Sequence, residues 1–213
     1  MNSEHFRYLA AMGITPWKLN TTHSSSPNEW ESLQQAVIHC TACGLDKTRT
    51  QTVFGVGNHN AKLMVIGEAP GFYEDQKGEP FVGRAGQLLD AMLATIHLDR
   101  STVYIANILK CRPPNNRDPL PEEVNRCTPF LAKQIAFIQP ALLLAVGRIA
   151  AHFLLETKTS LGALRNKIHR YGQLNTPLII TYHPAYLLRN PRDKRKAFQD
   201  LQLIHRTLIE LTT

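Results

Sequence analysis

The segment Leu63-Met-Val-Ile-Gly-Glu-Ala-Pro-Gly71 decides the fold class of this chain of 213 residues. An unbroken apolar run that ends in a turn of glycine and proline is typical of a short strand buried on both faces. Comparable apolar runs occur at 103–108, 141–146 and 178–182. Helical stretches separate these runs, and the alternation predicts an α/β fold with a parallel sheet and helices on both faces.

Five stretches carry helix signals. Ser26, Pro27 and Glu29 form a capping signal at the start of the first one. Pro121 starts another and is followed by two glutamates, which favour the amino end of the helix dipole. The expected helices cover residues 27–39, 84–98, 121–138, 148–155 and 192–211.

Three loops rich in polar residues follow the carboxyl ends of predicted strands. They are Gly67–Gly71, Asn107–Pro114 and His183–Arg189. Parallel sheets bind ligands at this edge, outside the carboxyl ends of their strands. We therefore expect the side chains of these loops to converge on one cleft.

Composition and charge narrow the class of protein. Apolar residues make up 43% of the chain, which is enough for a hydrophobic core, and the formal net charge of +7 suits a polyanionic partner such as nucleic acid. No apolar stretch approaches the ~20 residues of a membrane span. The first residues also lack the pattern of a signal peptide. We expect a cytoplasmic, monomeric protein with no membrane contact.

The amino-terminal residues 1–26 differ from the rest. An apolar cluster at 6–17 precedes a polar run at 20–26, which indicates a peptide on a flexible tether. A folded domain at 27–213 follows. The peptide either packs on the core of its own chain or binds a partner.

The chain has four cysteines, and a reducing compartment disfavours disulfides between them. Cys40 and Cys43 form a C-x2-C pair, whereas 15 residues separate Cys111 from Cys127. A close pair and a stretched pair favour an iron–sulfur cluster over zinc as the bound group. Four buried thiols without metal are the alternative.

Four motifs resemble the family 4 uracil-DNA glycosylases, which carry an iron–sulfur cluster. The motifs are Gly67–Gly71, Pro80-Phe-Val-Gly83, Tyr104–Pro114 and His183–Asn190, and the cysteines follow the pattern of that family. The resemblance covers about residues 35–211. It implies a three-layer α/β/α sandwich on a four-stranded parallel sheet, with a [4Fe-4S] cluster on the four cysteines.

The resemblance also implies a reaction. Such an enzyme flips uracil out of single- or double-stranded DNA and hydrolyses its N-glycosidic bond, which leaves an abasic site for base excision repair. The motifs imply no lysine nucleophile, so strand cleavage is not expected. The competing hypothesis is a non-catalytic DNA-binding scaffold for replication or repair that a metal site stabilises.

Chemistry and resemblance together assign roles around the base. The amide of Asn107 complements uracil O4 and N3–H, and Phe81 stacks on the ring. His183 donates a hydrogen bond to O2 as negative charge develops there. Glu68 faces the sugar, either as a general base or as an electrostatic or structural group. Better-known uracil glycosylases place their acid one residue later, where this chain has Ala69.

Further residues are candidates for selectivity and DNA binding. Glu74, or alternatively Tyr73, would exclude the methyl group of thymine. Leu187 and Leu188 would wedge into the base stack, or else begin a short packed helix. The candidate phosphate contacts are Lys110, Arg112, Arg117, Arg165, Lys167 and Arg189, each of which has a solvated surface charge as its alternative.

The peptide at 6–17 weakly resembles the start of the psi subunit of DNA polymerase III. That resemblance implies docking on a replication accessory subunit.

Overall fold

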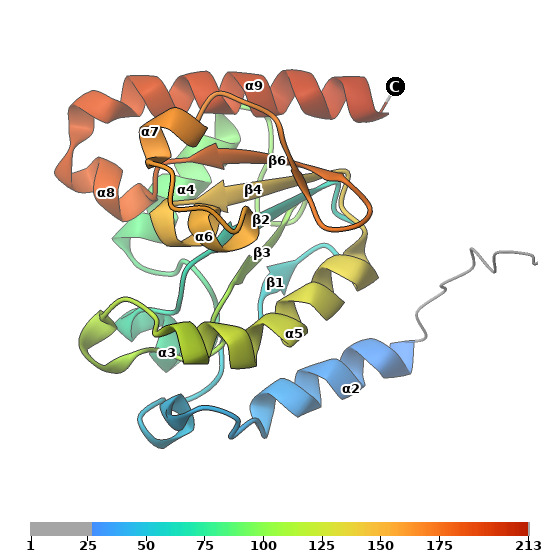
Figure 1. Cartoon of the computed structure of the whole chain (residues 1–213). Helices are drawn as coiled ribbons and strands as arrows, with labels where there is room; N and C mark the ends of the chain where they lie inside the picture. The colour runs from blue at the N-terminus through green and yellow to red at the C-terminus, as the bar shows by residue number, and fades with distance from the viewer. Residues whose placement is uncertain (1–26, 213) are drawn as a thin grey trace, which may run out of the picture.

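The computed structural model describes residues 27–212 (Figure 1). Its centre is one sheet in the strand order β1-β3-β2-β4-β6-β5. The strands are β1 (Val56–Gly57), β2 (Leu63–Gly67), β3 (Tyr104–Asn107), β4 (Leu142–Val146), β5 (His169–Tyr171) and β6 (Thr176–Thr181). The inner four, β3, β2, β4 and β6, run parallel. This arrangement confirms the predicted α/β class.

The sheet has six strands, and four were expected. Strands β1 and β5 pair antiparallel with its two outer parallel strands. Both are short and only partly buried, so neither contains the apolar run that revealed the inner strands. The inner strands β2, β3 and β4 are buried along their whole length, which explains their unbroken apolar sequences.

Helices cover both faces of the sheet and complete three layers. They are α2 (Pro27–Ile38), α3 (Phe72–Lys77), α4 (Arg84–Ala94), α5 (Pro121–Ile138), α6 (Arg148–Leu154), α7 (Leu161–Leu164), α8 (Pro184–Arg189) and α9 (Lys194–Thr212), with 3-10 turns at Gly44–Lys47, Pro114–Asn116 and Pro191–Asp193. The five predicted helices are confirmed, although α4 ends earlier than expected and a 3-10 turn precedes α9. The short helices α3, α7 and α8 were not predicted, because one or two turns show no periodicity.

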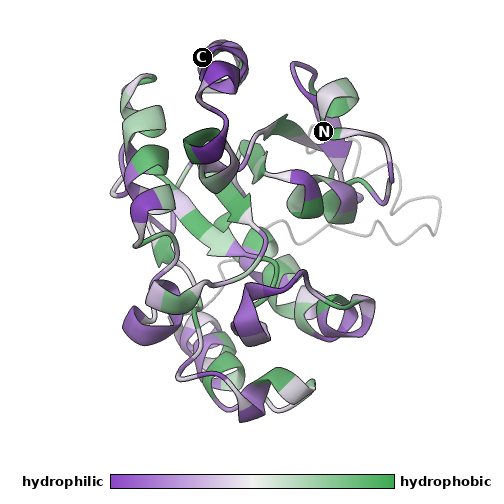
Figure 2. Ribbon diagram, turned by 90° about the vertical axis from the view of Figure 1, so that its left-hand side faces the viewer, coloured by the Kyte–Doolittle hydropathy of each residue, from purple (hydrophilic) through white to green (hydrophobic). Residues whose placement is uncertain are grey.

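The core has one half on each face of the sheet. On one face, apolar residues of α2, α5 and α6 pack on Met64, Ile66 and Tyr104. On the other, residues of α4, α8 and α9 pack on Val65 and Ile105. Figure 2 shows the strands as a hydrophobic centre, with hydrophilic residues on the outward sides of the helices. Successive strand residues face opposite layers, as the twofold period of a strand requires.

Two expectations fall on residues outside the described part of the chain. The peptide at 6–17 and the capping residue Ser26 both precede α2, and the described residues start at Pro27. Within residues 27–212, no helix combines the length and apolar content needed to cross a bilayer.

Candidate active site and cysteine cavity

A cavity of about 460 Å³ opens at the carboxyl edge of the parallel strands. It brings together polar residues from the three predicted loops. The lining residues are Glu68, Ala69, Pro70, Gly71, Glu74, Phe81, Ala85, Asn107, Pro113, Asn116, Arg117, His183, Ala185, Tyr186 and Arg189. The residues predicted to surround the base or carry out the reaction therefore lie close together, as expected for loops that follow the carboxyl ends of parallel strands. They are Glu68, Ala69, Glu74, Phe81, Asn107 and His183.

Asn107 is the last residue of β3 and lies in register with Gly67 on β2. Its side chain is buried, and its Oδ1 atom has no hydrogen-bond partner among the described residues. Position 67 must be glycine, because a Cβ there would lie 2.3 Å from that Oδ1. Buried acceptors are almost always satisfied in native structures, so an unpaired one in a cavity wall indicates a ligand that donates to it.

Phe81 forms another wall of the cavity. Its ring stacks on the imidazole of His183, with ring centroids 5.7 Å apart and planes inclined by 30°. Its backbone has φ = 56°, which is unfavourable for a residue with a side chain. Arg100 holds this conformation by donating to the carbonyl oxygen of Phe81 and, at 3.1 Å, to that of Pro80. Arg100 is itself oriented by Asp90, whose carboxylate accepts from Nε at 2.7 Å.

His183 is held as a neutral imidazole with a defined tautomer. It caps α8, and its Nδ1 atom accepts a hydrogen bond from the backbone N–H of Ala185 at 3.1 Å. A nitrogen that accepts carries no proton, so the proton of the neutral ring is on Nε2. Burial lowers the pKa of His183 to about 4, and the positive charge of Arg189 adds to this effect. The ring can therefore donate from Nε2 at neutral pH without carrying a charge.

Glu68 follows β2 directly and is mostly buried at the cavity wall. Burial raises the pKa of Glu68 from 4.5 to about 7. The negative charge of Asp118 adds to the rise, and the positive charge of Arg148 opposes it. Those two residues pair with each other, with 3.0 Å between Arg148 Nη2 and Asp118 Oδ2. A carboxyl group with a pKa near 7 is divided between its acid and base forms at neutral pH.

Glu74 and Ala69 also line the cavity. The Oε1 atom of Glu74 accepts from the backbone N–H groups of Val82 and Gly83 at 3.0 and 3.2 Å. Glu74 thus connects α3 to the loop that carries Phe81. Gly71 leaves room for it, since a Cβ at position 71 would lie 2.7 Å from Oε2. Ala69, half-buried, offers only a methyl group to the cavity.

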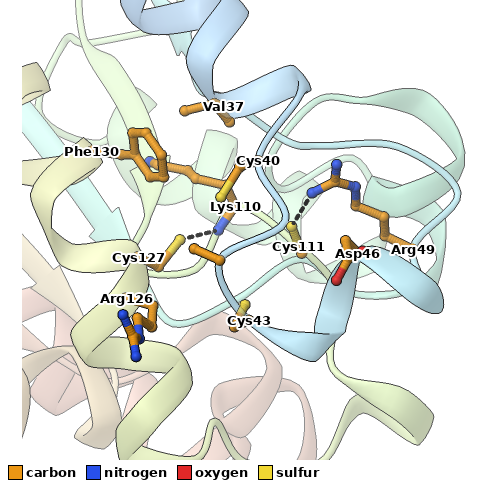
Figure 3. Close-up of a pocket in the computed structure, with 11 residues that line it drawn as sticks. Val37, Cys40, Cys43, Asp46, Arg49, Lys110, Cys111, Arg126, Cys127 and Phe130 are labelled. Carbon is orange, nitrogen blue, oxygen red and sulfur yellow. Dashed lines mark hydrogen bonds between the residues drawn. The ribbon is translucent and has the colours of Figure 1, made fainter.

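The four cysteines surround a second cavity, and Figure 3 shows their sulfur atoms facing a common space. Cys40 and Cys43 lie in the turn after α2, Cys111 follows β3, and Cys127 is in α5. All four are free thiols. Arg49 donates from Nη1 to Cys111 Sγ at 3.0 Å, and the N–H of Lys110 donates to Cys127 Sγ at 3.2 Å.

The described thiols do not form a single-ion metal site. A zinc ion with bonds of 2.3 Å would need its four sulfur atoms ~3.8 Å apart. Among residues 27–212, no three Cys, His, Asp or Glu side chains are close enough for a single ion. The four thiols line one cavity without the close spacing of a single-ion site. Burial also raises the pKa of Cys127 to about 11, so a bare thiolate there is disfavoured and a cationic centre would compensate for it.

Comparison with known proteins agrees with this geometry. The model of the uracil DNA glycosylase superfamily matches residues 54–202. The chain is 43% identical to a type-4 uracil-DNA glycosylase of Archaeoglobus fulgidus, over 82% of this chain and 90% of that protein. Proteins of the same description from Thermotoga maritima and Pyrobaculum aerophilum are 43% and 40% identical, over 81% of this chain and 91% of each relative. The chain belongs to the type-4 uracil-DNA glycosylase family.

Three predicted DNA contacts of this type-4 family member are wrong: Lys110, Leu187 and Arg165. Lys110 is 1% exposed, and its Nζ donates to the carbonyl oxygen of Asn107 at 2.9 Å and to Gln134 Oε1 at 2.6 Å. No phosphate can reach it. Leu187 is also 1% exposed and packs in the core under α4 and α9, so it cannot enter a base stack. Leu188 is half-buried on the same helix, α8, which was the alternative considered for both leucines.

The remaining charged candidates have different surroundings. Arg189 is exposed at the cavity. Arg117 lines the cavity but pairs with Glu123, at 2.9 Å from Nη1 to Oε2. Arg112 lies above the ring of Phe72, 5.1 Å from its centroid. Arg165 is buried against Asp200, at 2.8 Å from Nε to Oδ2, which excludes it as a phosphate contact.

Three residues that line the cavity of this type-4 protein, or act on residues that do, were not predicted from the sequence. Arg148 follows β4, whose carboxyl end lies at the same edge of the sheet as Asn107 and Gly67. Because ligands bind outside the carboxyl ends of parallel strands, the position of Arg148 after β4 could have been predicted in the same way as the other three loops. Tyr186 lies within the motif after β6 but was not singled out. Arg100 comes from a turn remote in sequence, and no local pattern indicates its contact with Phe81.

Proposed function

We propose that the chain is a monofunctional uracil-DNA glycosylase. It takes a uracil from DNA into the 460 Å³ cavity and hydrolyses the bond between uracil N1 and sugar C1′. The unpaired Oδ1 of Asn107 carries this proposal, because a buried acceptor at the cavity wall matches the N3–H donor of uracil. Membership of the type-4 family supports the same substrate.

Asn107 distinguishes uracil from cytosine. Its Oδ1 accepts from N3–H, and its Nδ2 donates to O4. Cytosine presents an acceptor at N3 and an amino donor at C4, so a fixed amide would face two mismatched pairs. The aromatic ring of Phe81 binds the face of the pyrimidine, and this stacking is the same for every base. Affinity and selectivity thus come from different side chains.

His183 and Glu68 act on opposite ends of the breaking bond. As the C1′–N1 bond breaks, its electron pair passes to uracil, and Nε2–H of His183 donates to the O2 atom that gains charge. The ionised carboxylate of Glu68 stabilises the positive sugar and orients a water molecule. The water oxygen bonds to C1′, and its proton passes to Glu68. The products are uracil and an abasic site.

Strand cleavage would need an amine that attacks C1′. Among the described residues that line the cavity there is no lysine. Lys110 lies close in sequence, but its ammonium group is bound to Asn107 and Gln134 on the inner side of the strand. The reaction therefore stops at base release.

We infer that Cys40, Cys43, Cys111 and Cys127 hold a [4Fe-4S] cluster, with zinc as the less favoured alternative. The cluster would connect the end of α2, the segment after β3 and α5, which supports the strand end that carries Asn107. Its chemistry here is structural cross-linking through thiolate bonds. Equal amounts of iron and acid-labile sulfide in the purified protein, near four of each, test the assignment, and a colourless protein that contains only zinc would refute it.

Base-release analysis tests the function. Oligonucleotides that contain uracil, thymine, cytosine or hypoxanthine are treated with the protein and then with alkali. Uracil release with alkali-dependent strand breaks supports the proposal. Tight, salt-sensitive binding without release would favour a non-catalytic scaffold instead. Asn107→Asp is the companion variant, and unchanged discrimination between uracil and cytosine in that variant would refute base reading by the amide.

Residues 6–17 remain a proposed partner segment for a replication accessory subunit. Recovery of replication proteins by the full chain, but not by a chain without residues 1–26, would support that role. Equal recovery would exclude it.

A further inference from the structure

Two aromatic side chains at the rim of the active-site cavity stay exposed. Phe72 and Tyr73 begin α3 and are 49% and 64% exposed. Their rings contact each other edge to face, with centroids 5.5 Å apart. The residues on either side of the pair, Gly71 and Glu74, line the cavity. The pair therefore lies directly beside the position proposed for the flipped uracil.

These rings take no part in either half of the core that the described residues form. Adjacent large aromatic side chains on a surface leave much apolar area in water, which usually indicates a binding surface. Tyr73 instead lies over Gly83, where a Cβ would be 3.5 Å from its Cδ2 atom. Tyr73 thus lies against the loop that carries Phe81.

A cation accompanies the aromatic pair. The guanidinium of Arg112 lies 5.1 Å from the centroid of Phe72. Its Nε also donates to Asn116 Oδ1 at 2.7 Å, and Asn116 lines the cavity. Exposed rings beside an arginine form the combination by which proteins hold single-stranded nucleic acid, because the rings stack on bases and the cation binds phosphate.

We propose that Phe72 and Tyr73 form a stacking platform for the base next to the flipped uracil. A base whose neighbour leaves the stack exposes one of its faces, and an aromatic ring at the rim replaces the lost contact. Arg112 binds the phosphate of the same nucleotide. This inference rests on the proposed function and adds a second contact site to it: the enzyme recognises an unstacked nucleotide beside uracil.

The test is a double-mutant cycle between protein and DNA. Wild type, Phe72→Ala and Tyr73→Ala are compared on single-stranded oligonucleotides in which a tetrahydrofuran abasic analogue replaces the base on the 5′ or the 3′ side of uracil. Binding is measured by anisotropy with an uncleavable uracil nucleotide, and KM and kcat with the cleavable one. Phe198→Ala is the matched control, since Phe198 is 45% exposed on α9.

The platform predicts that at least one alanine variant raises Kd and KM about tenfold, with a much smaller change in kcat. Removal of the neighbouring base on one side should raise the Kd of the wild type by a similar factor and raise the Kd of that variant little. Phe72→Leu should restore less affinity than Phe72→Trp. Phe198→Ala should behave as wild type.

Two results would overturn the platform. One is a Kd that does not change in either variant, and the other is an additive loss, in which the missing base and the missing ring act independently. A gain of thymine release in Tyr73→Ala would remove Tyr73 from the platform and assign it to base selection. Uracil release by the wild type is measured in the same experiment, so failure of the proposed function itself would be visible separately.

Discussion

The carbonyl oxygen of Phe81 occupies the space that a side chain at Gly86 would need. A Cβ at position 86 would lie 1.6 Å from this oxygen. Gly86 is in the first turns of α4, so the helix backbone and Arg100 together confine the backbone of Phe81 in its left-handed conformation. The orientation of the ring that faces His183 thus depends on a residue that does not contact substrate.

Gly86→Ala should therefore damage both folding and activity. We expect a loss of about 3 kcal/mol in the free energy of unfolding, because the helix or the Phe81 loop must move. Urea unfolding measures this loss, and single-turnover base release should slow at least about tenfold as the ring shifts. Gly162→Ala in α7 is the control, since no atom lies within 4 Å of a Cβ there. Equal behaviour of the two variants would contradict the confinement of the Phe81 backbone by α4.

The pH dependence of the reaction should follow Glu68. The carboxylate form is needed, and the pKa of Glu68 is about 7, so kcat/KM should fall tenfold per pH unit below about 7. His183 does not produce this limb, because its pKa is about 4. Glu68→Gln should lower the rate and abolish the limb. A limb that persists in this variant would assign the titration to another group.

The same shift of pKa makes Glu68 a cost to stability at high pH. Between pH 4.5 and about 7 the folded protein keeps a proton on Glu68 that the unfolded chain has lost, so stability falls as pH rises through this window. Relative to wild type, the free energy of unfolding of Glu68→Gln should therefore rise by about 1–2 kcal/mol from pH 5 to pH 8, after allowance for solvent screening. Urea unfolding at both pH values measures the difference, and a gain that is the same at both would contradict it.

Leu187 should matter for stability and not for DNA binding. Leu187→Ala removes a side chain from the core between α4 and α9, which should cost about 2–5 kcal/mol in the free energy of unfolding. Leu188→Ala, on the half-buried side of α8, should cost less. Anisotropy with uncleavable DNA should give unchanged affinity for folded Leu187→Ala. A weaker affinity at unchanged stability would restore the wedge interpretation.

Arg49 should protect the proposed cluster. Its guanidinium joins Cys111 Sγ to the carbonyl oxygen of Ile38 at the end of α2, at 3.0 and 2.9 Å. Without the hydrogen bond to sulfur and this connection, Arg49→Ala should lose its visible absorption in air several times faster than wild type. Arg126→Ala is the control, because Arg126 lines the same cavity but points away from the sulfur atoms in Figure 3. Equal rates in the two variants would exclude this role.

The sequence predicted the parallel strands and the residues at their ends, because both depend on local patterns. Glu68, Asn107 and His183 follow apolar runs, and the edge of a parallel sheet brings such positions together. Lys110 and Leu187 show where local patterns fail. A lysine after a strand is normally solvated, but here Gln134, 24 residues later, accepts from it inside the core.

Side-chain orientation in short helices was equally unpredictable. Two adjacent leucines face different directions on α8, and a helix of six residues is too short for periodicity to show which one is buried. The contact of Arg100 with the Phe81 loop depends on how a distant turn packs, which no spacing in the chain reveals.

The segment from Asn107 to Cys111 joins the two cavities through one buried lysine, Lys110. Lys110 holds the backbone of Asn107 at its Nζ and the sulfur of Cys127 at its amide, while the next residue is itself a proposed iron ligand. A preparation with incomplete metal would then be a mixture of two populations. In one, Asn107 is positioned to discriminate bases, and in the other it is displaced. Its specific activity and its fidelity would decline together, in proportion to iron content.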